Sequence, residues 1–190
     1  MAVGLTLLAG AAVAIAALTR RRPAHGEPDG VRHEALAAYL HDHLGGAEVA
    51  IQVVERLRRT STSADERMFF EWLYRQLDQD REVVELLLRG LKASPMSAKR
   101  FAGHASGALL KFLAGGARGD LALFRTLEAL AIGVQGKRCM WRALQFLRPG
   151  LAVPGRTLTD LESDALRQWE AIEERRRALV PQTFAAAEDA

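Results

Sequence analysis

Residues Ser63–Leu91, with the sequence SADERMFFEWLYRQLDQDREVVELLLRGL, carry the clearest structural signal in this chain. Their apolar members recur at spacings of three, four and seven, a pattern typical of a helix with one buried face; they are Phe69, Leu73, Leu77, Val84, Leu87 and Leu91. The opening Ser63-Ala64-Asp65-Glu66 is typical of a capping box, in which Ser63 and Glu66 satisfy each other's free backbone amides. This stretch therefore predicts one long amphipathic helix.

Similar patterns on both sides of this segment predict further helices and almost no strand. They are expected at about 31–59, 95–114, 120–148 and 160–180, the last opened by a capping box at Thr159-Asp160-Leu161-Glu162. Short connections between long helices make consecutive helices antiparallel neighbours. The sequence therefore predicts an all-α fold, an up-down four-helix bundle with an additional C-terminal helix, spanning residues 31–180 and followed by a flexible tail at 181–190.

An N-terminal transmembrane helix is expected to precede this bundle. Residues 1–19 carry no charged side chain and just reach the length that a membrane-spanning helix needs. Arg20, Arg21 and Arg22 follow at once, and the positive-inside rule places them and the bundle on the cytoplasmic side. We therefore expect a single-pass protein of the cell membrane, with a basic, Pro/Gly-containing linker at 20–30. A cleaved secretory signal is the alternative, with Ala12-Val13-Ala14 as its cleavage site.

The charge balance narrows the classes of partner. The formal net charge is +3, and Arg20, Arg21 and Arg22 account for all of it. These arginines could contact anionic lipids, whereas the neutral bundle lacks the excess of basic residues expected of a nucleic-acid binder. Cys139 is the only cysteine, which excludes an internal disulfide and a site built on several thiolates. We expect a membrane, a protein partner, no nucleic acid and no cofactor.

Several polar residues occupy positions where the helical pattern calls for apolar ones. Asp80 lies between Leu73 and Leu87 on the apolar stripe, and Gln76 lies one turn earlier. His43 and Glu48 fall on or beside the stripe of the 31–59 helix, and Glu128 shares a face with Ile132 on the 120–148 helix.

Folding the first two helices back at the turn near Thr62 brings His43 level with Asp80. A parallel 120–148 helix then places Lys137 or Arg138 at the same height. The sequence therefore predicts one polar layer made by His43, Asp80 and either Lys137 or Arg138.

Two interpretations of this layer remain open. The first is a buried charge pair, because a carboxylate inside a bundle is costly unless a cation neutralises it. The second is a metal site with Glu48, Asp80, Glu128 and His43 as candidate ligands, since helical bundles build such sites from inward carboxylates and histidines. The Glu-x-x-His spacing of ferritin-type di-iron sites does not occur in the sequence, which favours the charge pair.

Two motifs resemble a group of uncharacterised bacterial helical-bundle proteins loosely described as ferritin-like. The segment Tyr39–Ala47 matches their YL-x-DHL-x-G-A motif, and Leu127–Lys137 with Trp141–Leu144 resembles their fourth helix. Asp80-Arg81 fits their acidic residue followed by arginine. The resemblance covers about residues 38–147. It implies the helical-bundle fold and a special role for Asp42, His43, Asp80, Glu128 and Lys137, and the description as ferritin-like would imply metal chemistry.

Three hypotheses follow for the function. The leading one is a membrane-anchored, non-catalytic interaction or scaffold module, which predicts a polar layer closed by hydrogen bonds from Asp80 to Lys137 or His43, with no cavity. The alternative is a ferritin-like metal-binding or redox protein, which predicts carboxylates converging on a wet space. The third is a protein that binds a small ligand between its helices.

Overall fold

The computed structural model describes residues 29–91, 119–147 and 152–185, and these residues are almost entirely helical. This confirms the predicted all-α class. The helix expected at 95–114 and the membrane segment at 1–19 lie outside the described residues. The elements are α2 (Asp29–Thr60), α3 (Ala64–Gly90), α5 (Asp120–Leu147), β1 (Ala152–Val153), β2 (Arg156–Thr157), α6 (Leu158–Ala178) and α7 (Val180–Phe184).

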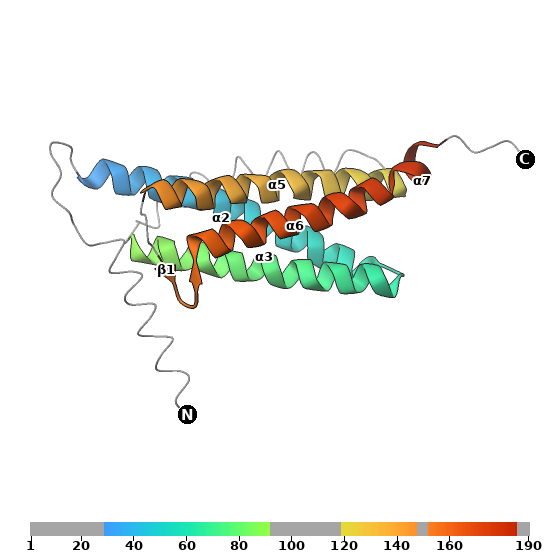
Figure 1. Ribbon diagram of the computed structural model, residues 1–190, viewed down its shortest axis with the longest axis horizontal. Coiled ribbons are helices and arrows are strands. Elements are labelled where there is room, and N and C mark those ends of the chain that lie inside the picture. Colours follow the sequence, from blue (N-terminus) through green and yellow to red (C-terminus); the bar gives the residue numbers. More distant parts are fainter. Residues whose placement is uncertain (1–28, 92–118, 148–151, 186–190) are drawn as a thin grey trace, which may run out of the picture.

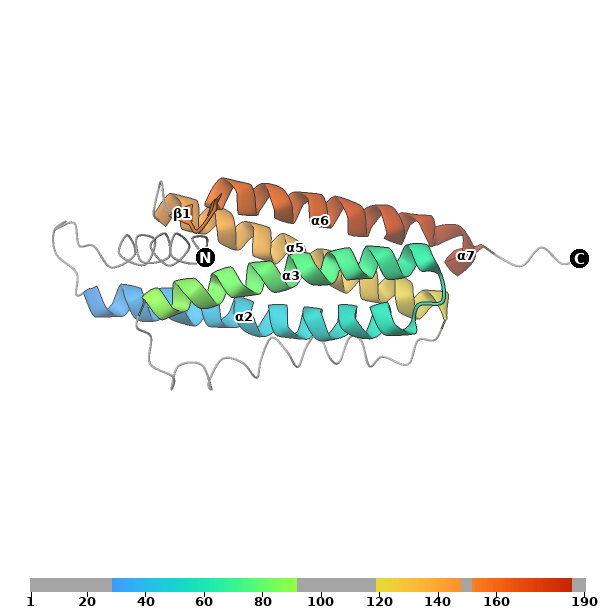
Figure 2. The same ribbon diagram turned by 90° about the horizontal axis from the view of Figure 1, so that it is seen from below.

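The four long helices lie side by side with their axes roughly aligned (Figures 1 and 2). α2 and α3 form one antiparallel pair, and α5 and α6 form a second. Further contacts join α2 to α5 and α3 to α6. Figure 1 shows that α3 and α5 run in the same direction, as the predicted polar layer requires. Asp80 and Lys137 can therefore lie at the same height.

The α2–α3 hairpin turns at Ser61–Ser63, where the sequence predicts a break. Arg58 near the end of α2 forms an ion pair with Glu71 of α3 across this turn. Ser63 is the N-cap of α3, but its side chain makes no capping hydrogen bond, so the capping box predicted at Ser63–Glu66 is wrong. The bend and the ion pair, rather than a capping box, define this end of the hairpin.

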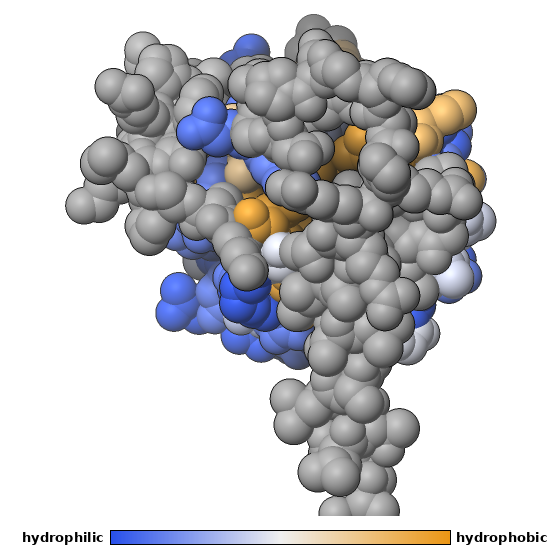
Figure 3. Space-filling model, turned by 90° about the vertical axis from the view of Figure 1, so that its left-hand side faces the viewer, coloured by the Kyte–Doolittle hydropathy of each residue, from blue (hydrophilic) through white to orange (hydrophobic). Residues whose placement is uncertain are grey.

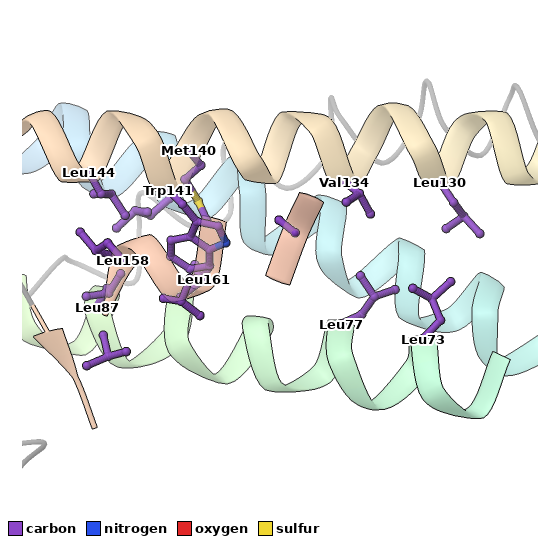
Figure 4. Close-up of a cluster of buried hydrophobic side chains, with 14 of the residues drawn as sticks. Leu73, Leu77, Leu87, Leu130, Val134, Met140, Trp141, Leu144, Leu158 and Leu161 are labelled. Atoms are coloured by element: carbon purple, nitrogen blue, oxygen red, sulfur yellow. The ribbon is translucent and has the colours of Figure 1, made fainter. Parts of the chain in front are cut away.

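Apolar residues of α3, α5 and α6 fill the interior. Leu73 and Leu77 of α3 face Leu130 and Val134 of α5 (Figure 4). Farther along the bundle, Trp141 is fully buried, and it packs in a group with Leu87, Met140, Leu144, Leu158 and Leu161. Figure 3 looks at the end of the molecule where Figure 1 labels β1, and it shows hydrophobic residues towards the centre of this face and hydrophilic ones mainly towards its margin.

The start of α6 differs from the sequence prediction. A two-residue antiparallel hairpin, β1–β2, precedes the helix, with Gly155 at φ +75° in its turn, a conformation that favours glycine. The capping box is formed by Thr157 and Asp160, not by Thr159 and Glu162: the Asp160 backbone N–H donates to Thr157 Oγ1, and the Thr157 N–H donates to Asp160. The register shifts by two residues because Thr157, at the end of β2, already has the extended backbone of an N-cap.

The first and last helical residues of the bundle also differ from those predicted from the sequence. Asp29 and Gly30, which we assigned to the linker, belong to α2. α6 ends at Ala178, two residues before the predicted end at Val180, and Leu179 is its C-cap. Residues 181–184 of the expected flexible tail instead belong to the short helix α7, with Pro181 in its first turn, where a missing N–H costs nothing. Among the helices of the described residues, none is long and apolar enough to cross a membrane. Residues 1–28 lie outside that description.

Replacing the cap residue tests the position of the α6 N-terminus. We expect Thr157→Ala to lower the free energy of unfolding by about 1 kcal/mol, because it removes the side-chain oxygen that accepts from the Asp160 amide. Thr159→Ala is the matched control and should change stability far less. Urea denaturation of both variants measures their free energies of unfolding. A larger decrease for Thr159→Ala would support the capping box at Thr159–Glu162 that the sequence predicted.

Candidate functional site

A buried ion pair between α3 and α5 is the centre of the candidate site. Lys137 Nζ donates a hydrogen bond to Asp80 Oδ2 at 2.6 Å. Asp80 is 2% exposed and Lys137 is 9% exposed. The two residues lie on parallel helices, each in a position that otherwise holds apolar side chains, so folding places both charges inside the molecule together.

Gln168 of α6 completes the network, and our sequence analysis missed it. Lys137 Nζ donates to Gln168 Oε1, and Gln168 Nε2 donates to Asp80 Oδ2 at 3.0 Å, so the three side chains form a closed triangle. Gln168 is 1% exposed. A signal was available, because Gln168 lies between Ala165 and Ile172 on the apolar stripe of α6, just as Asp80 interrupts the stripe of α3.

A second cation approaches the same carboxylate from the β1–β2 hairpin. Arg156 Nη1 lies 3.9 Å from Asp80 Oδ1, and its other terminal nitrogen forms an ion pair with Asp164 of α6. Oδ1 itself has no hydrogen-bond partner among the described residues. No sequence pattern links Arg156 to Asp80, because the contact depends on how the hairpin folds over the start of α6.

Burial dominates the electrostatics of Lys137. It lowers the pKa of the Lys137 ammonium below its usual range, and the Asp80 carboxylate offsets part of that shift by favouring the charged form. Each charge therefore compensates for the desolvation of the other. Removing one partner of such a pair typically costs about 3–5 kcal/mol, because the remaining charge stays buried without compensation.

A cavity of ≈ 340 Å³ lies beside this ion pair, between α2, α3 and α5. Its walls are mainly apolar, and Asp80, Lys137, Tyr39, Asp42, His43 and Arg81 contribute the polar or charged groups. The charge-pair interpretation predicted no cavity here, and that part of it is wrong. The small residues Gly133 and Gly136 border this space, and a Cβ atom on either would meet nothing within 4 Å.

His43 borders the cavity but is not hydrogen-bonded to Asp80. Its ring lies edge-on to Tyr39, with 4.7 Å between centroids. Burial lowers the pKa of His43, with Asp42 opposing the shift, and burial raises the pKa of Tyr39. Both side chains are therefore uncharged at neutral pH, and they complete the side of the cavity that α2 forms.

The other candidate residues lie apart from the ion pair. Glu48 is exposed on α2, and Gln76 is half-buried on α3 outside the hydrogen-bonded triangle. Glu128 is half-buried and close enough to Arg176 to influence its pKa. Arg138 was the alternative to Lys137, but its Nε instead lies 3.4 Å from Oε1 of Glu162 on α6.

Within residues 29–91, 119–147 and 152–185, no group of three His, Cys, Asp or Glu side chains is arranged to hold a metal ion. The four proposed ligands do not converge.

Breaking the pair from one side tests whether it is the main polar contact of the core. We expect Lys137→Met to lower the free energy of unfolding by about 3–5 kcal/mol, because Asp80 is left buried without its cation. The double variant Asp80→Leu/Lys137→Met should recover most of this loss, because it leaves no buried charge. Glu82→Ala, an exposed position on α3, should change stability by less than about 0.5 kcal/mol.

Chemical denaturation of the four proteins gives these free energies. A small loss for Lys137→Met, similar to that of Glu82→Ala, would show that the ion pair contributes little to stability.

No family model, curated protein or solved structure matches this chain. The resemblance to ferritin-like bacterial proteins therefore stays an expectation, and the function has to be inferred from the residues of the site and the surface.

Proposed function

We propose that this protein is a membrane-tethered, non-catalytic helical-bundle module that acts through protein–protein contact. In this proposal residues 1–19 anchor the chain, Arg20–Arg22 contact anionic headgroups, and an up-down four-helix bundle with an additional C-terminal helix lies on the cytoplasmic side. The closed triangle of Asp80, Lys137 and Gln168 favours a structural role for the polar layer, because its groups bond to one another. In this proposal the protein acts through its surface, which contacts the partner, and the polar layer stabilises the fold.

An exposed apolar stripe on α5 is the observation that carries this proposal. Ile132, Cys139 and Phe146 recur at intervals of seven, so they lie along one side of the helix. Ile132 is 67% exposed, Phe146 is 86% exposed, and Cys139 is exposed as well. The core-facing side of α5, with Leu130, Val134 and Trp141, is already occupied. Among the described residues nothing covers this row, and an aligned set of exposed apolar side chains is typical of an interaction site.

The partner that fits this stripe best is a second copy of the same chain. An antiparallel two-fold pairing of two α5 helices places Ile132 opposite Cys139 of the second copy. The same pairing brings Glu128 within one turn of Arg142 of the second copy, and Arg142 is 58% exposed at its side chain. A two-fold interface needs one patch that complements itself, and this arrangement has an apolar centre with opposite charges towards its ends.

A cysteine placed opposite Cys139 tests the pairing. We expect Ile132→Cys, in the full chain in detergent micelles, to form a disulfide-linked dimer under mild oxidation. Wild type should form little, because the two Cys139 residues would be offset by about 10 Å along the helices, beyond the reach of a disulfide. Glu170→Cys, which adds a cysteine at an exposed site on α6, is the control for random collision.

Non-reducing electrophoresis separates the linked and free chains. Equal crosslinking of Ile132→Cys and Glu170→Cys, or none in either, would contradict the α5 pairing.

A single thiol away from the α5 stripe tests the membrane orientation, because the proposed pairing covers Cys139, the only cysteine of the chain. Cys139→Ser/Glu170→Cys supplies that thiol at an exposed site on α6. We expect the full chain to stay with membranes after alkaline extraction and a variant lacking residues 1–19 to be released. A membrane-impermeant maleimide should label the cysteine at position 170 of Cys139→Ser/Glu170→Cys only after the cells are opened, since the proposal places the bundle in the cytoplasm. Labelling in intact cells would contradict the cytoplasmic orientation. Release of the full chain by alkaline extraction would contradict the membrane anchor at residues 1–19.

A further inference from the structure

The cavity between α2, α3 and α5 is large enough, and apolar enough, to hold a small molecule. At ≈ 340 Å³ it falls within the range of ligand pockets in proteins. Its apolar walls come from all three helices: Ala47 and Ala50 on α2, Leu77 and Val84 on α3, and Leu130, Val134 and Met140 on α5. An aliphatic ligand would be stabilised here because its apolar surface would be removed from water.

Glycines on two of these helices keep the space open. Gly46 of α2 and Gly133 and Gly136 of α5 border the cavity, and a Cβ atom added at any of them would meet nothing within 4 Å. A glycine inside a helix is less favourable than alanine. No close backbone contact requires these three glycines, and they leave open space along the cavity. Gly133 is exposed, so the cavity opens to solvent at this position.

The charged residues in the lining of the cavity determine which class of ligand can bind there. Asp80 and Lys137 are both buried there, and their charges neutralise each other. Of the other charged residues of the lining, Arg81 is paired with Asp78 and Glu85, and Asp42 is exposed to solvent. A charged ligand would therefore find no free counterion in the buried part of the cavity. An ammonium has three N–H donors. Among the described residues Lys137 uses two of them, on Asp80 and Gln168, and its third N–H has no acceptor.

We propose that this cavity binds an uncharged aliphatic molecule with one oxygen head group, of the alcohol class, whose oxygen accepts the third hydrogen bond of Lys137. The chain of the ligand lies against Leu77, Val134 and Met140. This inference is independent of the proposed self-association, because the cavity and the Ile132–Cys139–Phe146 stripe lie on different sides of α5.

A methyl group in the wall of the cavity gives a local readout. Met140 borders the cavity, whereas Met68 is 70% exposed on α3 and does not. With ¹³C-methyl-labelled methionine in the full chain, in detergent micelles, titration with 1-octanol should shift the Met140 signal to saturation. The Met68 signal should stay in place, which separates binding from effects of the alcohol on the micelle. Met140→Leu assigns the signal.

Filling the cavity supplies the matched variant. Gly133 is exposed where it borders the cavity, so Gly133→Leu places an apolar side chain at the opening of the cavity. We expect it to raise the octanol concentration at half-shift at least tenfold, and to raise Tm because leucine favours a helix more than glycine does. Ala143→Leu adds the same bulk on an exposed side of α5 and should leave the octanol response unchanged. Octanoate and octylammonium should bind at least tenfold more weakly than octanol, because each would bury an uncompensated charge.

Three results would overturn the inference. One is a Met140 signal that does not respond to octanol, and another is an equal response to the two charged analogues. The third is a lower Tm for Gly133→Leu, which would mean that another part of the chain already fills the space.

Discussion

The polar contacts in the middle of the bundle depend on the need to neutralise one buried carboxylate. Asp80 lies inside the apolar core, where an unpaired charge would cost several kcal/mol. Lys137 supplies the cation from α5, Gln168 supplies both a donor and an acceptor from α6, and Arg156 approaches from the hairpin that opens α6. One side chain of α3 thus fixes the relative height of three helices. Sliding any of them by a turn would leave a charge or an amide buried without a partner.

The two sides of this ion pair differ in a way that bears on function. Towards α6 the polar atoms are bonded to one another, whereas towards α2 the same residues border an apolar cavity that His43 and Tyr39 help to line. A layer that only fixed the helix register would be expected to have packed side chains on both sides. This difference between the α6 side and the α2 side of the ion pair is why we propose a binding site in the core. The proposed interface lies elsewhere, on the outer side of α5.

The ferritin-like alternative depended on four side chains meeting at one point. Glu48 is exposed, Glu128 lies towards Arg176, and only His43 and Asp80 border a common space. The sequence pattern allows all four side chains to point into the bundle. Which of them do so depends on how each helix is rotated about its own axis. A pattern of spacings fixes a stripe only to within part of a turn, so Glu48 at the edge of its stripe was free to face solvent.

The sequence by itself determined the helical class, the main breaks near Thr62 and Gly119, and Asp80 as a buried polar residue, because period and capping preference act over a few residues. It also narrowed the partner of Asp80 to His43, Lys137 or Arg138. Only the tertiary structure chose Lys137, added Gln168 and Arg156, moved the α6 cap to Thr157 and opened a cavity beside Gly133. These outcomes depend on the rotation, height and spacing of helices that are far apart in the chain, and no local pattern encodes those three quantities.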